Sequence, residues 1–245
     1  MLRAFIQHIQ ETTRPQIVQV EGETFSVGAQ ESCQLRPELD CPDTLPLQSL
    51  DALVRLVQTE AGVLAGEGEP LYITVPDHLT VRCFGRPDYG MRCHRQVWYE
   101  ARAVDVPGWG EKVSLGFEEA QIALRTRFQE TADTPYVQKL LSEISCGAKI
   151  VYNDNGIATT ITTQKGVALQ SNECIRPIVT LRPYRTFQEV EQPESIFLIR
   201  VSDRGISFTE ADGGMWKLRA RETVKAWLEG RLQAEAEAGK VIIAL

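Results

Sequence analysis

Tight turn signals between short runs of β-branched residues constrain this chain more than any other feature of its sequence. The clearest lies in AKIVYNDNGIATTITTQ, where Asn155-Gly156 separates two runs rich in Ile, Val and Thr. An Asn-Gly pair tolerates the positive φ angles of two-residue hairpin turns, so this stretch predicts an antiparallel hairpin. ESIFLIRVSDRGISFTEADGG predicts another hairpin that turns at Asp203-Arg204-Gly205, and QIVQVEGETFSV predicts one around Glu21-Gly22.

Further strands follow from the same reading. EPLYITVPDHLTVRCFG and RQVWYEARAVDV are strand-rich and predict a hairpin joined by a polar loop. IVTLRPYRTF predicts a strand that Pro183 interrupts, because proline cannot donate to a sheet. KVIIAL predicts a short apolar strand at residues 240–245. Residues 28–46 are rich in Gly, Pro, Cys and Asp and predict a surface connection.

Helical spacing of apolar residues predicts about five helices between these hairpins. The stretches are MLRAFIQHIQETTRP, LPLQSLDALVRLVQTEAG, GFEEAQIALRTRFQETA, DTPYVQKLLSEISCG and WKLRARETVKAWLEGRL. In the second of them the predicted apolar stripe is Leu50, Leu53, Val54 and Val57, and Gly62 predicts the C-terminal end. Hairpins with helices between them are typical of an α+β fold with a mainly antiparallel sheet. We expect a single domain over 1–245, with a weaker alternative of two parts, 1–112 and 113–245.

Charge and hydropathy narrow the function classes. The formal net charge is -7, which disfavours generic binding to duplex nucleic acid, since that binding rests on clustered Lys and Arg. Several arginines nevertheless lie between residues 176 and 221, so a local basic patch stays open. No apolar run is long enough to span a membrane, and the N-terminus lacks the apolar segment of a secretory signal. We therefore expect a cytoplasmic protein.

Motifs for catalysis or metal binding are weak. There is no glycine-rich phosphate loop and no G-x-S-x-G motif, and the sequence predicts no catalytic residue and no cofactor. An enzyme is the less favoured alternative, although catalytic residues converge in space and not in sequence. Six cysteines form no Cys-x-x-Cys pair; Cys83, Cys93 and His94 come nearest to a ligand set, and we predict no metal.

The stretch TLRPYRTFQEVEQPES, residues 180–195, is the strongest candidate for a binding site. It interleaves arginines and glutamates with two aromatic residues. Arginine and tyrosine are common anchors at interfaces, and arginine grips anions, which favours a ligand or partner site. The other interpretation is a salt-bridged seam of the fold. The candidate ligand- or partner-binding residues are Arg182, Tyr184, Arg185, Glu189, Glu191 and Trp216.

Several phrases together resemble a known group of sequences. VTLRPYRTFQEVEQPESIFLIR, FTEADGGMWKLRARETVKAWLE and LLSEISCGAKIVYNDNG are similar to an uncharacterised family of tailed phages and prophages of Gram-positive hosts. The order of helices and strands is more distantly similar to the YfdQ-like phage domain of unknown function. The strand ending at Thr180-Leu181-Arg182 departs from the more apolar pattern of that domain. The resemblance implies a phage protein that works inside an infected or lysogenic bacterial cell, and it transfers no catalytic residue.

These observations favour a phage accessory protein that acts by binding and without catalysis. Its partner would be a host protein, such as a defence component, or a small anionic ligand. One alternative is a protein that binds single-stranded nucleic acid in phage replication or recombination, through stacking rings and arginines. Another is a self-assembling structural phage protein that pairs exposed strand edges, and we expect a homo-oligomer.

Overall fold

The structure, a computed structural model, describes residues 16–20, 23–27, 32–35, 43–64, 69–87, 95–145, 151–154, 159–165, 168–202 and 204–245. Its contacts divide the chain into a smaller unit, Met1–Asp43 with Asp88–His94, and a larger unit, Thr44–Pro87 with Arg95–Leu245. The helix predicted over residues 1–15 lies outside the described residues. The single domain and the subdivision near residue 112 stay predictions.

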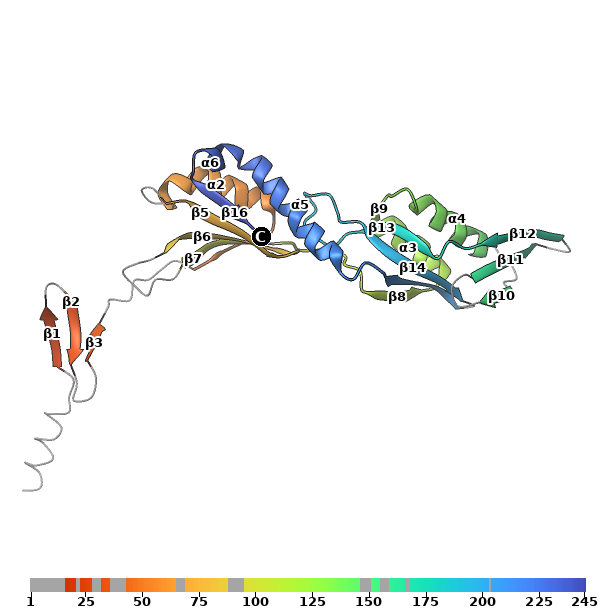
Figure 1. Ribbon diagram of the computed structural model, residues 1–245, viewed down its shortest axis with the longest axis horizontal. Helices are drawn as coiled ribbons and strands as arrows, with labels where there is room; N and C mark the ends of the chain where they lie inside the picture. Colours follow the sequence, from red (N-terminus) through yellow and green to blue (C-terminus); the bar gives the residue numbers. More distant parts are fainter. Residues whose placement is uncertain are drawn as a thin grey trace, which may run out of the picture. The chain divides into compact units, whose positions relative to one another are not determined.

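The smaller unit contains one antiparallel sheet (Figure 1). Its strands, in sheet order, are β1 (Gln16–Val20), β2 (Glu23–Val27) and β3 (Ser32–Leu35). Val20 pairs with Glu23, which confirms the hairpin around Glu21-Gly22. The prediction of a plain surface connection over 28–46 is wrong, because β3 lies within that range and the later strand β4 (Leu45–Leu47) begins in it. Both strands are short, and the Gly- and Pro-rich composition around them obscured them.

The first sheet of the larger unit has two parallel pairs at its edges. Its strands, in sheet order, are β16 (Val241–Ala244), β5 (Leu71–Asp77), β6 (Thr80–Pro87), β7 (Arg95–Arg102) and β4. β16 lies parallel to β5 and β4 lies parallel to β7, while the inner pairs are antiparallel. The hairpin predicted from EPLYITVPDHLTVRCFG and RQVWYEARAVDV is present as β6–β7. The first of these two stretches contains two strands, β5 and β6, which form a further hairpin that the sequence does not predict. Self-assembly through the outer edge of β16 stays a prediction.

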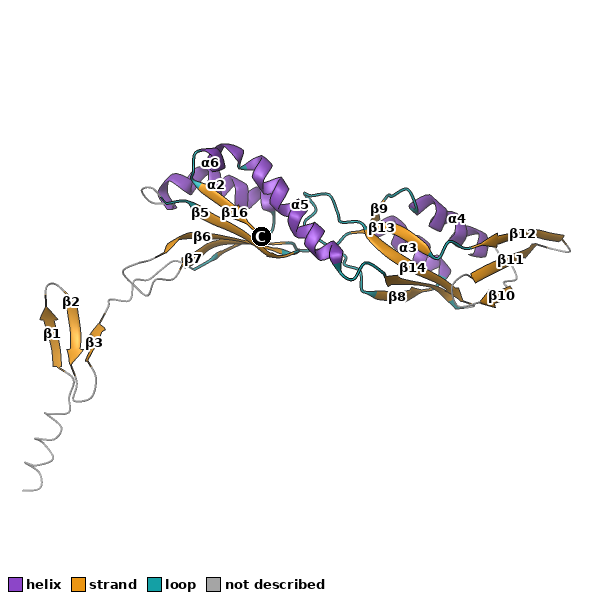
Figure 2. Cartoon of the chain, in the orientation of Figure 1, coloured by secondary structure: helices purple, strands orange, loops and turns teal. Residues whose placement is uncertain are grey.

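Helices α2 (Leu50–Leu64) and α5 (Met215–Arg231) lie over one face of this sheet, with the short α6 (Gln233–Glu237) beside them (Figure 2). In β5, Leu71, Ile73 and Val75 alternate inward and are fully buried, as expected for a strand covered on one face. The predicted stripe of α2 is confirmed, because Leu50, Leu53, Val54 and Val57 are all buried in the same core. α2 continues past Gly62, the predicted end, to Leu64.

The second sheet of the larger unit is antiparallel throughout. Its strands, in sheet order, are β8 (Lys112–Leu115), β15 (Gly205–Glu210), β14 (Ser195–Ser202), β13 (Ile178–Pro183) and β9 (Phe128–Gln129). Helices α3 (Phe117–Thr126) and α4 (Thr134–Ser145) supply buried residues to its core. Ser202 pairs with Gly205, which confirms the hairpin predicted there.

A third sheet contains β10 (Val151–Asp154), β11 (Thr159–Lys165) and β12 (Ala168–Cys174). Asp154 pairs with Thr159, so the hairpin predicted from Asn155-Gly156 is confirmed, although those two residues lie outside the described part of the chain. The predicted fold class is therefore confirmed: an α+β protein rich in antiparallel hairpins. No helix among the described residues is long and apolar enough to cross a membrane.

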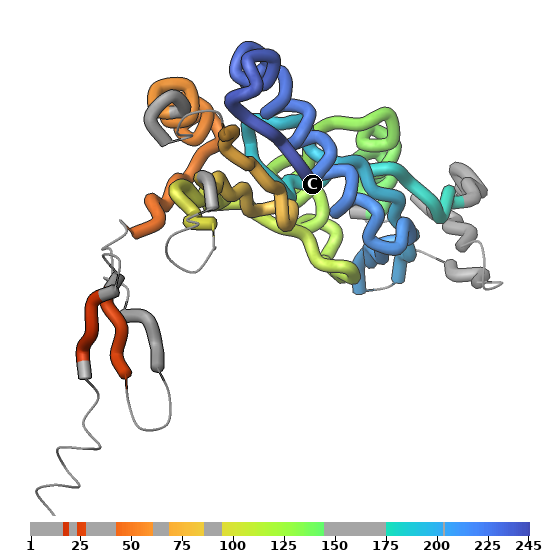
Figure 3. Tube along the Cα trace, turned by 60° about the vertical axis from the view of Figure 1, so that its left-hand side comes forward, coloured from red at the N-terminus to blue at the C-terminus, as the bar shows by residue number. Residues whose placement is uncertain are grey.

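The segment between β13 and β14 joins the two cores of the larger unit (Figure 3). Both strands contribute to the second core, which includes Leu181 and Phe197. Phe187 and Val190, which lie between the strands in sequence, are buried in the first core with α2 and α5. The chain thus leaves one core, enters the other and returns. This path fixes the position of Arg185 between the two cores.

Candidate functional site

Arg185 is a buried charge, because its side chain is only 2% exposed. Its Nη2 forms an ion pair with Oε1 of Glu210, which is 9% exposed, and its Nη1 donates to Ser195 Oγ at 3.2 Å. The guanidinium carbon lies 4.3 Å from the centre of the Trp216 ring, a favourable cation–π distance. The Arg185 guanidinium therefore follows the rule that a buried ion must be paired and hydrogen-bonded.

Glu210 holds two side chains at once. Its second oxygen, Oε2, accepts a hydrogen bond from Trp216 Nε1 at 3.2 Å. Glu210 ends β15 and Trp216 is the second residue of α5, so the short turn between these elements brings ring and carboxylate together. Burial lowers the pKa of Arg185, and the charges of Glu210 and Asp212 oppose that effect. The guanidinium still keeps its charge, since arginine is not deprotonated in proteins.

A cavity of about 300 Å³ lies beside this cluster, and we call it the Arg185 cavity. Its walls come from the β5–β6 turn, the loop before β8, the segment after β13, the end of β15 and the start of α5. Seven of its lining residues carry rings or charges: His78, Trp109, Glu111, Arg185, Glu210, Trp216 and Lys217. A small cavity with aromatic walls and a few charged groups is typical of a small-molecule site.

His78 contributes an uncharged imidazole to the cavity. Its ring centre lies 4.8 Å from that of Trp216, and the two rings are nearly perpendicular at 77°. Burial lowers the pKa of His78, Lys217 and Arg185 lower it further, and Asp77 opposes them. At neutral pH the ring is therefore neutral and offers one N–H donor and one nitrogen acceptor.

Two buried donors of residues that line the cavity have neither a hydrogen-bond partner nor an ion-pair partner among the residues that the structure describes. They are Nε of Arg185 and Nε1 of Trp109. Buried N–H groups in proteins almost always find an acceptor, so these two favour a water molecule or ligand with acceptor oxygens. Lys217 adds an exposed ammonium group, with Nζ 5.7 Å from the centre of the Trp216 ring.

The six residues predicted from the sequence lie in different places. Arg185 and Trp216 meet at the Arg185 cavity, whereas Tyr184 is half-buried and does not line it. Arg182 forms ion pairs with Glu191 and Glu194, each at 2.7 Å. Glu189 is separate again: its Oε1 accepts from the backbone N–H of Leu50 at 2.9 Å, at the start of α2. In the described structure Arg182, Glu189 and Glu191 therefore make the contacts of a structural seam.

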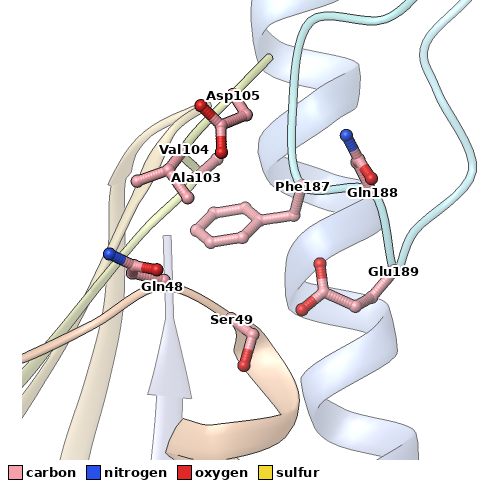
Figure 4. Close-up of a pocket in the computed structure, with 8 residues that line it drawn as sticks. All are labelled: Gln48, Ser49, Ala103, Val104, Asp105, Phe187, Gln188 and Glu189. Carbon is pink, nitrogen blue, oxygen red and sulfur yellow. The ribbon is translucent and has the colours of Figure 1, made fainter.

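A second cavity, of about 400 Å³, is lined by residues 187–189 of the segment between β13 and β14, together with residues 48–49 and 103–105 (Figure 4). Figure 4 shows the Phe187 ring pointing toward Ala103 and Val104, with the carboxylates of Asp105 and Glu189 on either side. The residues that line it include these two acids and no Lys, Arg or His. Its charge is therefore unsuitable for an anion, and Glu189 already caps α2. We take the Arg185 cavity as the candidate site.

The sequence reading missed His78, Trp109, Glu210 and Lys217. Trp109 lies in a loop and His78 in a turn, and neither sits in a recognisable motif. Glu210 and Trp216 flank ADGG at residues 211–214, and this closeness in sequence was the one signal that could have joined them. The remaining partners come from segments far apart in the chain, so no local pattern predicts their meeting.

The cysteine cluster considered from the sequence is only partly described. Cys83 is fully buried in the first core, and burial raises the pKa of its thiol to about 12. Cys93 and His94 lie outside the described residues. Within the described part of the chain, no three His, Cys, Asp or Glu side chains gather in a way that could hold a metal ion.

No protein-family model, curated protein or solved structure matches this chain. The resemblance to phage and prophage proteins stays a prediction.

Proposed function

We propose that this protein acts by binding and that the Arg185 cavity takes a small anionic ligand. The observation that carries the proposal is a guanidinium that is 2% exposed, lines a cavity and keeps one nitrogen without a partner among the described residues. The Trp109 N–H and the Lys217 ammonium add two further donors on the same walls. Donors that lack a partner favour a ligand with acceptor oxygens.

The same geometry supports binding better than catalysis. Glu210 is the buried carboxylate of the cavity, and both of its oxygens are engaged, one by Arg185 and the other by Trp216. Protein donors therefore occupy both carboxylate oxygens in this structure, and neither is left free to contact a reacting group. The aromatic walls suit recognition of a ring, which needs no reacting group.

The resemblance to phage proteins extends this proposal to a biological role. We propose that the ligand is a small metabolite or signal of the infected bacterial cell, and that the protein acts by sequestering it. A second proposal is that the protein interferes with a host protein. A ligand in the cavity changes the surface that a protein partner meets, so ligand binding can control this interaction. Single-strand binding is less favoured, because Phe187 is 1% exposed and Trp216 lines a small cavity, so that neither ring lies on an open surface that could stack on the bases of a strand.

Native mass spectrometry tests the proposal. The protein is incubated with a small-molecule extract of bacterial cells, desalted and weighed beside two variants, Lys217→Ala and Lys225→Ala. Both lysines lie on α5, but only Lys217 lines the cavity. We expect a bound small mass on the wild type and on Lys225→Ala, and a clear loss of it on Lys217→Ala. Bare wild-type protein, or equal retention by all three proteins, would contradict the proposal.

A further inference from the structure

The charges around the Arg185 cavity limit the charge of its ligand. The charged side chains that line it are two cations, Arg185 and Lys217, and two anions, Glu111 and Glu210. Arg185 and Glu210 already neutralise each other, which leaves one cation, Lys217, and one anion, Glu111, and these two form no ion pair in the described structure. A phosphate monoester carries close to two negative charges at neutral pH and would face two carboxylates. Lys217 can match one negative charge of a ligand, and Glu111 opposes a second one.

The free donors also suit a carboxylate better than a phosphate. Arginine usually grips phosphate with two parallel N–H groups. In Arg185, however, Nη1 donates to Ser195 and Nη2 pairs with Glu210, so Nε is the nitrogen without a partner among the described residues. The Trp109 indole likewise offers one N–H. Single donors of this kind can each bind one oxygen of a carboxylate.

Rings line the cavity and are held in place before any ligand binds. Trp109 packs edge-on against Phe128 at 4.7 Å and against Phe208 at 5.7 Å between ring centres. Trp216 is held by contacts with Arg185, Glu210 and the ring of His78. Rigid aromatic walls favour a flat ring, because little side-chain freedom is lost on binding. The volume of about 300 Å³ has room for one ring or two fused rings.

We infer that the ligand of the Arg185 cavity is a small planar aromatic monocarboxylate. This inference rests on the proposed function and narrows it. Lys217 supplies the counter-charge, Nε of Arg185 and Nε1 of Trp109 donate to the carboxylate oxygens, and the rings of His78, Trp109 and Trp216 contact the flat face or edge of the ligand.

The chain offers an internal reporter for this inference. It has four tryptophans, and only Trp109 and Trp216 line the cavity, while Trp98 and Trp227 do not. In protein labelled with ¹⁵N at the indole nitrogen, the four indole N–H signals can be followed by NMR. The probes are benzoate, 1-naphthoate and indole-3-carboxylate, with indole-3-carboxamide, indoxyl phosphate and acetate for comparison.

We expect at least one of the three aromatic carboxylates to shift the Trp109 and Trp216 signals saturably at millimolar concentration, with Trp98 and Trp227 unmoved. The carboxamide and acetate should bind at least about tenfold more weakly, since one lacks the charge and the other the ring. Lys217→Ala should weaken carboxylate binding about tenfold and leave carboxamide binding unchanged. Lys225→Ala should leave both unchanged.

The remaining outcomes separate the inference from the proposed function. Tighter binding of indoxyl phosphate than of every carboxylate would overturn the monocarboxylate inference and leave the anion-binding function standing. Equal binding of carboxylate and carboxamide would overturn both, because no anion would then be required. Signals that stay unmoved with every probe would also overturn both.

Discussion

Replacing Glu210 by glutamine should destabilise the fold more than replacing any exposed acid. The change keeps the shape of the side chain and removes its charge, so Arg185, at 2% exposure, loses its negative partner in the described structure. Breaking a buried ion pair by removing one partner costs about 3–5 kcal/mol. The amide oxygen can still accept one hydrogen bond, from Trp216 or from Arg185, so we expect the lower end, about 3 kcal/mol.

The matched control is Glu191→Gln, which removes the same charge from an arginine pair at the surface. Glu191 is 68% exposed, and its partner Arg182 keeps a second ion pair with Glu194 at 2.7 Å. An exposed pair contributes at most about 1 kcal/mol, so this variant should be almost as stable as the wild type. The two variants therefore differ in burial and not in chemistry.

Urea unfolding followed by far-ultraviolet circular dichroism measures both effects. We expect a clear fall in the midpoint for Glu210→Gln at an unchanged slope, and little change for Glu191→Gln. A loss below about 1 kcal/mol for Glu210→Gln, or equal losses for the two variants, would refute the reasoning that burial makes the Arg185 pair indispensable.

Three further predictions concern single residues. Cys83 is fully buried with its pKa raised to about 12, so iodoacetamide should modify its peptide in urea and not in the native protein; native labelling would contradict its burial. Gly205→Ala should cost more than about 2 kcal/mol, because φ is +145° and a Cβ would lie 2.0 Å from the Leu115 carbonyl oxygen. Gly213→Ala, which has nothing within 4 Å, should cost only the strain of a positive φ, about 1 kcal/mol, and similar unfolding midpoints would reject the distinction. His78 has a lowered pKa, so the unfolded chain takes up a proton near the ordinary value of 6.5 before the folded protein does, and stability should fall as the pH drops through that value. His78→Gln should remove this part of the pH dependence of the urea midpoint, and an unchanged dependence would count against it.

Local patterns predicted most of the elements of this fold. Asn155-Gly156 and Asp203-Arg204-Gly205 specify turns through the φ angles that their residues tolerate, and both hairpins are present. The stripe of α2 follows from helical spacing alone. The β5–β6 hairpin was missed because its turn at His78-Leu79 contains neither glycine nor asparagine, and the residues around it read as one continuous strand.

The candidate site was predicted only in part, for a related reason. Arg185 and Trp216 were chosen as residue types that bind, and the structure brings them together. Arg182 and Glu191 were chosen on the same grounds and pair with each other away from the cavity. Residue type suggests what a side chain can do, and its tertiary neighbours decide whether it is free to do it.

The sequence by itself determined the α+β class, the hairpins with glycine in their turns and the buried face of α2, because these depend on backbone angles and on periodicity within one segment. Only the tertiary structure decided the parallel pairing of β16 with β5, the passage of Phe187 into the first core, and the cavity beside Arg185. Each of these depends on which distant segment covers a given surface. Burial and the balance of charge are properties of that whole arrangement, and no short stretch of sequence contains them.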